Sequence, residues 1–384
     1  MNSLTKTEND DDVKMNCDDD MFEVDGSVME GGGQIIRMSI AFSALLGKSI
    51  KMSNIRAGRA KPGLQAQHMT GIKLASELCG ASVGGCHLQS TTVQFVPGVT
   101  RPTSSEFSAD IKTAGATTLL AQIALPCALL GQPSTTLLDL KGGTNADFAP
   151  QVEYYSQAFL PIMSKFGVTA KCDVIRKGYF PKGGGQVRLE VPPINELKAV
   201  DLTDFGELKS VSIYSSVAGT LNVKLAHEMA KSAKDILVKH LGGRQSSVQI
   251  HVDAYKETDA FGNGNSISIF AETSTGCILG AGGIGSRGKS GAALGAEAAE
   301  ELIGDLKLRA CLDQHLQDQV IIFMALASGV SRVRTGPLTL HTRTAIHVAE
   351  MLSGARFKVE ESSVDKDVHI IECHGIHFKN SRKN

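Results

Sequence analysis

The feature that most constrains the fold of this chain is an internal repeat. The tetrapeptide Ala-Leu-Leu-Gly occurs at residues 44–47 and again at residues 128–131, and the segments around both copies follow one plan. Apolar residues at helical spacing predict a helix that ends in each tetrapeptide. A short apolar strand, a glycine-bearing junction and a second helix follow, and the second helices end at Gly80 and Gly167. Alternating segments predict closing strands in both units.

A third copy of this unit runs from residue 314 to residue 374. Its first helix is expected over 320–330 and its second over 342–352, with His341 at the junction between strand and helix. Units of roughly 60–85 residues are far longer than solenoid repeats. The sequence therefore predicts an α/β core of three βα repeats around a pseudo-threefold axis, with the junctions close together.

Residues 194–310 do not follow the repeat. They contain helical and strand patterns of their own and predict an inserted, smaller α/β domain, which leaves residues 22–193 and 311–384 for the three-repeat core. Residues 1–21 hold seven acidic side chains against two lysines and no apolar region typical of a signal peptide. We expect these residues to form a disordered acidic tail.

Charge and composition limit the function classes. The overall net charge is −1 and the acidic tail contributes −5, so the remainder carries +4, which permits a nucleic-acid partner. No apolar run approaches the roughly 18 residues of a membrane span, so no membrane partner is expected. The eight cysteines form no CxxC pair, and metal ligation by cysteine is not expected.

Two glycine-rich segments near the N-terminus carry arginines. Arg56 and Arg59 flank Gly58, and guanidinium groups with exposed backbone N–H groups at a helix entrance suit phosphate. The alternative is a solvated basic loop. Upstream, Glu30 and Arg37 flank another glycine run, and Glu30 is the best candidate carboxylate for a hard divalent ion such as Mg²⁺ or Mn²⁺.

The third junction places His341 at the start of a helix. A neutral imidazole in this position is kept from protonating by the helix dipole and can act as a nucleophile. The alternative is a structural histidine, and the position of His341 at a junction equivalent to the arginine-rich one favours the nucleophile. His68 and His347 are interpreted as packed or surface residues.

Two nucleotide-binding patterns overlap in the inserted segment. Residues 280–285 match GxGxxG, and residues 283–290 match a Walker A loop that ends in Lys289 and Ser290. A dinucleotide site needs an acid after a second strand, and a P-loop needs further parallel strands, yet a helix and the third repeat occupy those stretches. We therefore predict that this loop has no part in catalysis.

Six segments together resemble RNA 3′-terminal phosphate cyclase of the eukaryotic kind. They are DGSVMEGGGQIIR, IRAGRAKPGLQAQH, KGGTNADFAP, RKGYFPKGGGQV, FGNGNSISI and HLQDQVIIFMALASGVSRVRTGPLTLHTRTAIH, and the similarity extends from Phe22 to Gly375. The resemblance implies the fold described above and an ATP-dependent enzyme. Such an enzyme transfers AMP to a histidine and then to an RNA 3′-phosphate. The resulting RNA-diphosphate-adenosine end closes to a 2′,3′-cyclic phosphate, and AMP and diphosphate are released.

Carried over by matching positions, the resemblance also implies site residues. His341 would be the adenylated histidine and Glu30 would contact the metal ion. ATP would contact Gln122, Pro150, His315, Asp318 and Gln319, and the phosphate groups or RNA would contact Arg37, Arg56, Arg59 and Gln67. His315 departs from the family, whose members carry tyrosine there, so stacking on adenine would be either weaker or made by imidazole.

Two other functions are kept open. The first is a non-catalytic cyclase-like protein that assists ribosomal RNA processing, a branch that lacks the nucleophilic histidine, so the intact LHTRTAIH segment favours the enzyme. The second is a P-loop NTPase that depends on Lys289. The resemblance implies a nuclear (nucleoplasmic) location with the cytoplasm left open, while the RNA substrate, the oligomeric state and the role of the tail are not specified.

Overall fold

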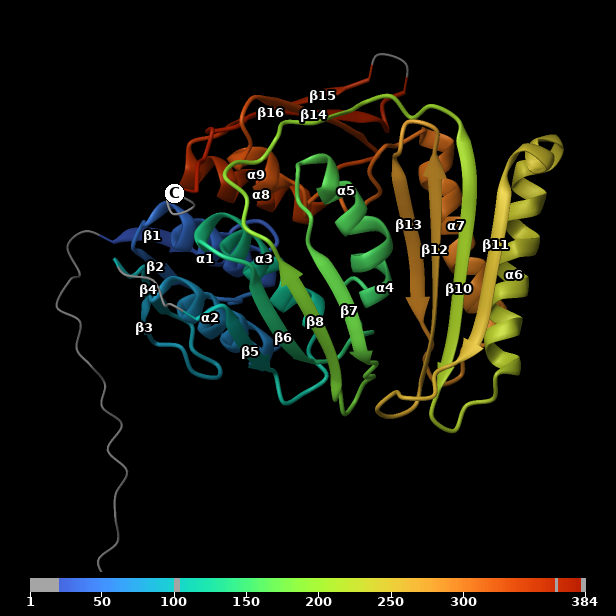
Figure 1. The fold of residues 1–384 in the computed structure, drawn as a ribbon, viewed down its shortest axis with the longest axis horizontal. Helices are drawn as coiled ribbons and strands as arrows, with labels where there is room; N and C mark the ends of the chain where they lie inside the picture. Colours follow the sequence, from blue (N-terminus) through green and yellow to red (C-terminus); the bar gives the residue numbers. More distant parts are fainter. Residues whose placement is uncertain (1–20, 100–103, 363–364, 381–384) are drawn as a thin grey trace, which may run out of the picture.

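The computed structural model describes residues 21–99, 104–362 and 365–380. All but the last residue of the predicted acidic tail lies outside these ranges. The described residues form an α/β fold with four sheets of four strands each. Three of the sheets belong to the repeated units and the fourth to the inserted segment (Figure 1).

The three units share one strand topology. In each unit, the first strand pairs in parallel with the second, which pairs antiparallel with the last strand, and the third strand is antiparallel to the last. The first unit consists of β1 (Phe22–Asp25), α1 (Gly33–Leu46), β2 (Ile50–Ser53), α2 (Ala66–Cys79), β3 (Ser82–Gly84) and β4 (Val93–Val96).

The second unit contains a less regular second helix, which is interrupted by a π-helical turn over Tyr155–Phe159. Its elements are β5 (Glu106–Asp110), α3 (Thr117–Gly131), β6 (Thr136–Gly142), α4 (Val152–Tyr154), α5 (Leu160–Lys165), β7 (Lys171–Arg176) and β8 (Gly185–Val191). The third unit consists of β9 (Asp201–Leu202), α8 (Ile321–Leu326), β14 (Val330–Thr335), α9 (Leu340–Ser353), β15 (Arg356–Glu361) and β16 (His369–His374).

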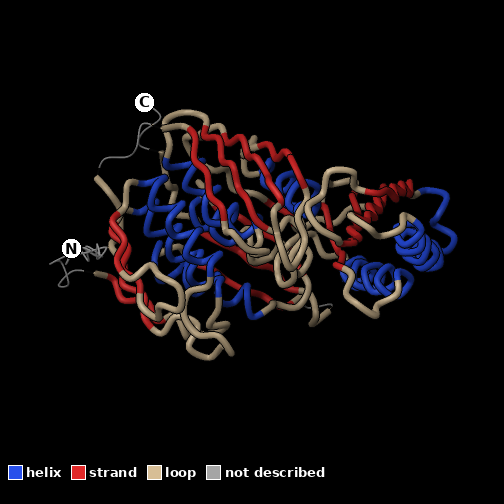
Figure 2. Tube along the Cα trace, turned by 90° about the horizontal axis from the view of Figure 1, so that it is seen from below, coloured by secondary structure: helices blue, strands red, loops and turns tan. Residues whose placement is uncertain are grey.

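The helices of the three units pack together inside, and the sheets lie outside them (Figure 2). Helix α1 contacts α2, α3 and α9, and all but three of its residues are buried. All residues of helix α3 except Gln122 are buried, because most of the helix is apolar. This arrangement brings the N-terminal ends of helices from different units into one region.

The inserted segment lies between β9 and α8. Its sheet has the order β11-β10-β12-β13, and two helices cover one face of that sheet (Figure 1). Its elements are β10 (Leu208–Ala218), α6 (Lys224–Leu241), β11 (Gln249–Lys256), β12 (Gly264–Thr273), β13 (Ile278–Ile284) and α7 (Gly291–Leu308).

The inserted domain was predicted to begin at residue 194, and strand β9 lies after that residue. Strand β9 pairs in parallel with β14, as β1 pairs with β2, so it is the first strand of the third unit. Lys198 also bridges to Ser328 of the core. A strand of two residues shows no alternation of apolar and polar side chains, so the sequence pattern could not reveal it.

None of the helices in the described part of the chain is both long and apolar enough to cross a membrane.

Candidate active site

His341 is the second residue of α9, at an exposed helix N-terminus. The helix begins with a side-chain cap, in which Thr339 Oγ1 accepts the N–H of Thr342 at 3.1 Å. The Thr342 hydroxyl then donates to Gln317 Oε1 at 2.7 Å and ties the helix entrance to the turn before α8. The positive end of the helix dipole therefore lies beside His341, where negative charge is stabilised.

Partial desolvation lowers the pKa of His341 below its usual value. Asp318 opposes this shift, whereas the positive charges of Arg37 and Arg59 add to it. His341 is therefore mostly neutral at neutral pH, with an unprotonated ring nitrogen available as a nucleophile.

Asp318 and Arg37 both line a small cavity between α1 and α8. Burial raises the pKa of Asp318 to about 6, while His341 and Arg37 oppose the rise. Burial lowers the pKa of Arg37 to about 10, and Asp318 partly restores it. The same cavity is lined by Gln122 and Gln319, so four residues predicted to contact ATP or phosphate meet here.

Glu30 forms an ion pair with Arg59, whose guanidinium also donates to the Glu30 carbonyl at 2.9 Å. The Glu30 backbone N–H donates to Thr344 Oγ1 at 3.2 Å, which joins the first unit to α9. The second carboxylate oxygen, Oε2, is buried without a hydrogen-bond partner.

The environment of Glu30 is compatible with a divalent ion, because one carboxylate with substrate phosphates is a common set of Mg²⁺ ligands. Within the described residues, no group of three or more His, Cys, Asp or Glu side chains could hold a metal ion without such a substrate.

Gln67 and His68, at the N-terminal end of α2, add further polar side chains to the site. Gln67 Oε1 accepts the N–H of Ala116 at 3.3 Å, which joins the first unit to the start of α3. His68 is buried, and burial together with Arg37 and Arg56 lowers its pKa to about 3. His68 Nδ1 accepts the N–H of Gln65, so its proton lies on Nε2. His68 is thus packed, as predicted, but its Nε2–H is a further donor beside the arginines.

His315 lies on the other side of the site and contacts the inserted segment. Its Nε2 is 2.6 Å from Glu301 Oε1 on α7, and its ring packs edge-on against Tyr154. Burial opposes its protonation, but the hydrogen bond to Glu301 and the charge of Asp313 raise the pKa of His315 to about 9. His315 is therefore a cation at neutral pH, unlike the tyrosine expected from the family.

Pro150 approaches the site from the second unit. Its carbonyl accepts the hydroxyl hydrogen of Thr118 at 2.8 Å, one helical turn before Gln122 on α3. The predicted site residues thus come from all three units and lie around the N-terminal ends of α1, α2, α3 and α9.

Sequence reasoning did not identify Glu301 or the donor role of His68. His68 could have been found, because it follows Gln67 at a helix entrance. Glu301 could not, because its contact with His315 joins the inserted segment to the third unit and leaves no pattern in the sequence.

The fold and the site define an α/β protein that gathers cations and a neutral imidazole at helix entrances, an arrangement suited to phosphate chemistry. A family model for RNA 3′-terminal phosphate cyclase matches residues 28–359. The chain is 40% identical over 340 residues to RNA 3′-terminal phosphate cyclase of Drosophila melanogaster, covering 88% of this chain and 92% of the relative.

Two further relatives show similar identity. A probable RNA 3′-terminal phosphate cyclase of Dictyostelium discoideum is 37% identical over 366 residues, which cover 93% of this chain and 83% of the relative. The cyclase of Pyrobaculum aerophilum is 38% identical over 355 residues, which cover 92% and 98%. The chain belongs to the RNA 3′-terminal phosphate cyclase family and is an enzyme of this kind.

Proposed function

We propose that this protein converts an RNA 3′-terminal phosphate to a 2′,3′-cyclic phosphate with ATP as cosubstrate, through AMP bound to His341. The observation that carries the proposal is the position of His341. It lies at the positive end of α9 with a lowered pKa, within electrostatic reach of Asp318 and Arg37. Family membership supports the overall cyclase reaction.

In the first step, an unprotonated imidazole nitrogen of His341 attacks the α-phosphorus of ATP. A nitrogen–phosphorus bond forms, and the bond to the diphosphate leaving group breaks. Arg37 and Arg59 lie within electrostatic reach of His341, and both can offset the negative charge that develops on the transferred group. Gln122, Gln319 and His315 would contact the nucleotide.

In the second step, an oxygen of the RNA 3′-phosphate attacks the phosphorus of the histidine-bound AMP. The nitrogen–phosphorus bond breaks, and the RNA ends in a diphosphate-linked adenosine. In the third step, the neighbouring 2′-hydroxyl attacks the RNA phosphorus, its proton is lost and AMP leaves with the bonding electrons. This step needs no further energy input because the nucleophile is already adjacent.

A divalent ion would be held by Glu30 together with phosphate oxygens of the substrates. Such an ion supplies positive charge that stabilises the leaving diphosphate. Arg59 holds the Glu30 carboxylate in place and Arg56 adds a second guanidinium at the same entrance.

Covalent labelling tests this proposal. Wild-type protein incubated with ATP labelled at the α-phosphate should become labelled, and an RNA 3′-phosphate should then discharge the label. His341→Asn should reduce labelling and cyclisation by roughly 10³-fold or more, because the nucleophile is removed.

The matched control is His347→Asn, a histidine on the same helix that the proposal does not use, and both variants should keep the wild-type unfolding midpoint. Normal labelling of His341→Asn would refute the proposal. A wild-type protein that neither labels nor cyclises RNA would favour the non-catalytic alternative.

A further inference from the structure

Four segments with residues that the proposed chemistry does not use line a single cleft. Their lining residues fall within 145–147, 179–182, 262–265 and, in the Walker-like segment, 284–289, and all contribute to one space of about 1000 Å³. The cleft lies where the ends of β7 and β8 meet the loops of the inserted segment, at the lower edge in Figure 1. These segments are far apart in the sequence, and the fold brings them together around one cleft.

Beside the cleft, the core and the inserted segment contact each other through aromatic rings that pack on glycines. Tyr179 of the core packs on Gly264 of the inserted segment, and Phe261 of the inserted segment packs on Gly184 of the core. A Cβ atom at either glycine would overlap the facing ring, so only glycine permits this approach. The N–H of Phe261 also donates to the Lys177 carbonyl at 2.7 Å. The cleft is therefore a preformed part of the fold.

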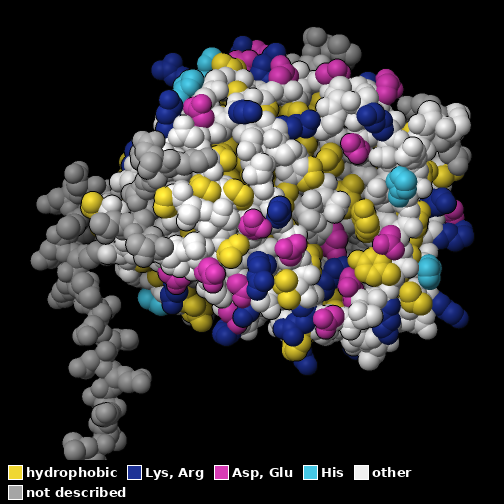
Figure 3. All heavy atoms as spheres, viewed as in Figure 1, with side chains coloured by type: hydrophobic (Ala, Val, Ile, Leu, Met, Phe, Trp, Pro, Cys, Tyr) yellow, Lys and Arg dark blue, Asp and Glu magenta, His cyan; other side chains and the backbone are white. Residues whose placement is uncertain are grey.

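Cations and an exposed aromatic ring lie at this cleft. Lys182 and Arg287 are exposed and come from opposite sides, while Asp147 is an exposed carboxylate among the lining residues. Lys289 is already paired with Glu297 and is not counted. Phe180 is 72% exposed, which is unusual for phenylalanine. Figure 3 shows Lys and Arg side chains beside hydrophobic ones at this lower edge, with acidic side chains nearby.

Hydrogen-bonded backbone connects the walls of the cleft to the candidate active site. Gln67 accepts a hydrogen bond from Ala116, and Ala116 forms a bridge with Gly143. The next residue, Thr144, donates its N–H to the Gly178 carbonyl at 2.9 Å, at the start of the segment that carries Phe180 and Lys182. Three adjoining stretches of backbone therefore separate the phosphate-binding entrance from the cleft.

We propose that this cleft binds the RNA strand on the 5′ side of the terminal phosphate. Phe180 stacks on a base, and Lys182 and Arg287 contact backbone phosphates. The proposal rests on the proposed function, because the strand is the substrate of the His341 site. Cations alternating with an exposed aromatic ring are typical of grooves that bind single strands without sequence preference, since every base has a face on which a ring can stack.

Substrate length provides the test. Cyclisation would be measured with two 3′-phosphate RNAs, a dinucleotide and an oligonucleotide of about 12 nucleotides, within the ~4–16 that single-strand grooves cover. Phe180→Ala should raise KM for the longer RNA by about 5- to 100-fold. The same variant should raise KM for the dinucleotide far less, because the dinucleotide does not fill the cleft.

Salt dependence tests the cations separately. In the double variant Lys182→Ala/Arg287→Ala, the slope of log binding constant against log salt for the longer RNA should be less steep by about 1.4, since each single-strand phosphate contact contributes about 0.7. The matched control is Lys234→Ala/Lys239→Ala, which removes two exposed lysines from the outer helix α6 and should leave slope and KM unchanged.

Three outcomes separate the two proposals. Larger KM effects on the longer RNA, with ATP labelling of the variants at wild-type level, would support the cleft. Wild-type KM and salt slope in all cleft variants, or equal effects on both RNAs, would overturn the cleft proposal while the cyclase function stands. Failure of the wild-type protein to label with ATP or cyclise either RNA would overturn the proposed function itself.

Discussion

The charge of His315 depends on a carboxylate from the inserted segment. Burial alone would keep the imidazole neutral, but Glu301 accepts its Nε2–H at 2.6 Å, and the pKa of His315 rises to about 9. A cationic ring beside the proposed nucleotide site can attract phosphate as well as stack on a base. Glu301 therefore raises the pKa of His315, although the two residues are not adjacent in the sequence.

We predict that Glu301→Gln lowers the pKa of His315 from about 9 to near or below the ordinary value of about 6.5. The neutral amide removes the charge partner, and burial then favours the neutral ring. An NMR pH titration of the His315 ring protons, assigned with His315→Gln, would measure the shift. An unchanged titration midpoint would show that Asp313 and Asp318 alone hold the charge.

The same contact predicts how stability depends on pH. A folded pKa of about 9 lies above the unfolded value of about 6.5, so the stabilisation is fully present below about 6.5 and is lost as pH rises through about 9. The gap in unfolding free energy between wild type and Glu301→Gln should therefore narrow over that range. Urea unfolding at several pH values would measure it, and a gap that widens with pH would contradict the assignment.

At the scale of helices and strands, the sequence pattern was sufficient to predict the elements that are repeated or long. The Ala-Leu-Leu-Gly repeats predicted α1 and α3, and Gly80 does end α2 with a positive φ of 67°. Strand β9 was missed because two residues show no alternation. The first helix of the third unit, expected over 320–330, is shorter, because α8 ends at Leu326 and the chain turns into β14.

Strand β13 and helix α7 decide how the Walker-like segment is interpreted. Strand β13 is antiparallel to its neighbour β12, whereas a P-loop follows a strand in a parallel sheet. Ser290 caps α7 by accepting the N–H of Ala293 at 3.2 Å, and Lys289 pairs with Glu297. Both residues that would hold phosphate or metal in a P-loop have structural partners here.

We therefore predict that Lys289→Ala leaves ATP labelling of His341 at the wild-type level. The lost ion pair is largely exposed on the side of Glu297, so the unfolding free energy should fall by at most about 1 kcal/mol. The labelling assay would run beside His341→Asn as the inactive reference. Loss of labelling in Lys289→Ala but not in the histidine variant would place the nucleotide site in the inserted segment.

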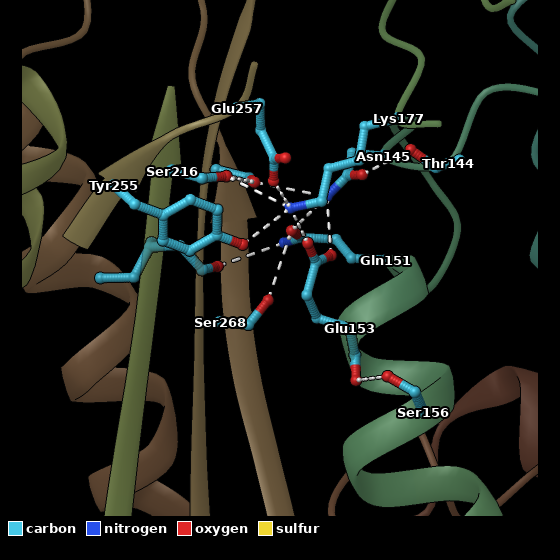
Figure 4. Close-up of polar contacts among 12 residues, drawn as sticks. Thr144, Asn145, Gln151, Glu153, Ser156, Lys177, Ser216, Tyr255, Glu257 and Ser268 are labelled. Atoms are coloured by element: carbon cyan, nitrogen blue, oxygen red, sulfur yellow. Dashed lines mark hydrogen bonds and ion pairs between the residues drawn. The ribbon is translucent and has the colours of Figure 1, made fainter. Parts of the chain in front are cut away.

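At the scale of the whole molecule, a buried cation joins the inserted segment to the core. Lys177 forms ion pairs with Glu153 of the core and Glu257 of the inserted segment (Figure 4). Its ammonium also donates to the Tyr255 hydroxyl at 3.2 Å. Although burial alone would lower it, Glu153 raises the pKa of Lys177 above its usual value, so the residue stays charged.

These ion pairs at the contact between the core and the inserted segment were not predictable from the sequence. Lys177, Glu153 and Glu257 lie in three separate segments, and a charged residue with no visible partner is expected at the surface. Only the convergence of the repeats and the return of the inserted segment onto β7 and β8 bring the charges together. The same holds for the cleft beside them, whose lining motifs were recognisable one by one but not as one surface.

The position of Lys177 predicts a large and specific effect on stability. Lys177 is 8% exposed and its partners 15% and 19%, so Lys177→Met would leave two carboxylates largely buried without a cation. Breaking a buried pair from one side costs about 3–5 kcal/mol, and partial exposure of the carboxylates places the expected loss of unfolding free energy at ~3 kcal/mol. Urea unfolding followed by circular dichroism would measure this loss.

The matched control is Lys171→Met, the same substitution in the nearby strand β7, where the lysine is 72% exposed and 3.9 Å from Glu190. It should cost less than about 1 kcal/mol. Adding Glu153→Gln and Glu257→Gln to Lys177→Met replaces the two unpaired carboxylates with neutral amides. The triple variant should recover part of the lost unfolding free energy, because the penalty comes from the unpaired carboxylates rather than from the missing lysine alone. Equal losses for the two lysine variants, or no recovery in the triple variant, would mean that the contact between core and inserted segment is held by the aromatic-on-glycine packing and not by this charge network.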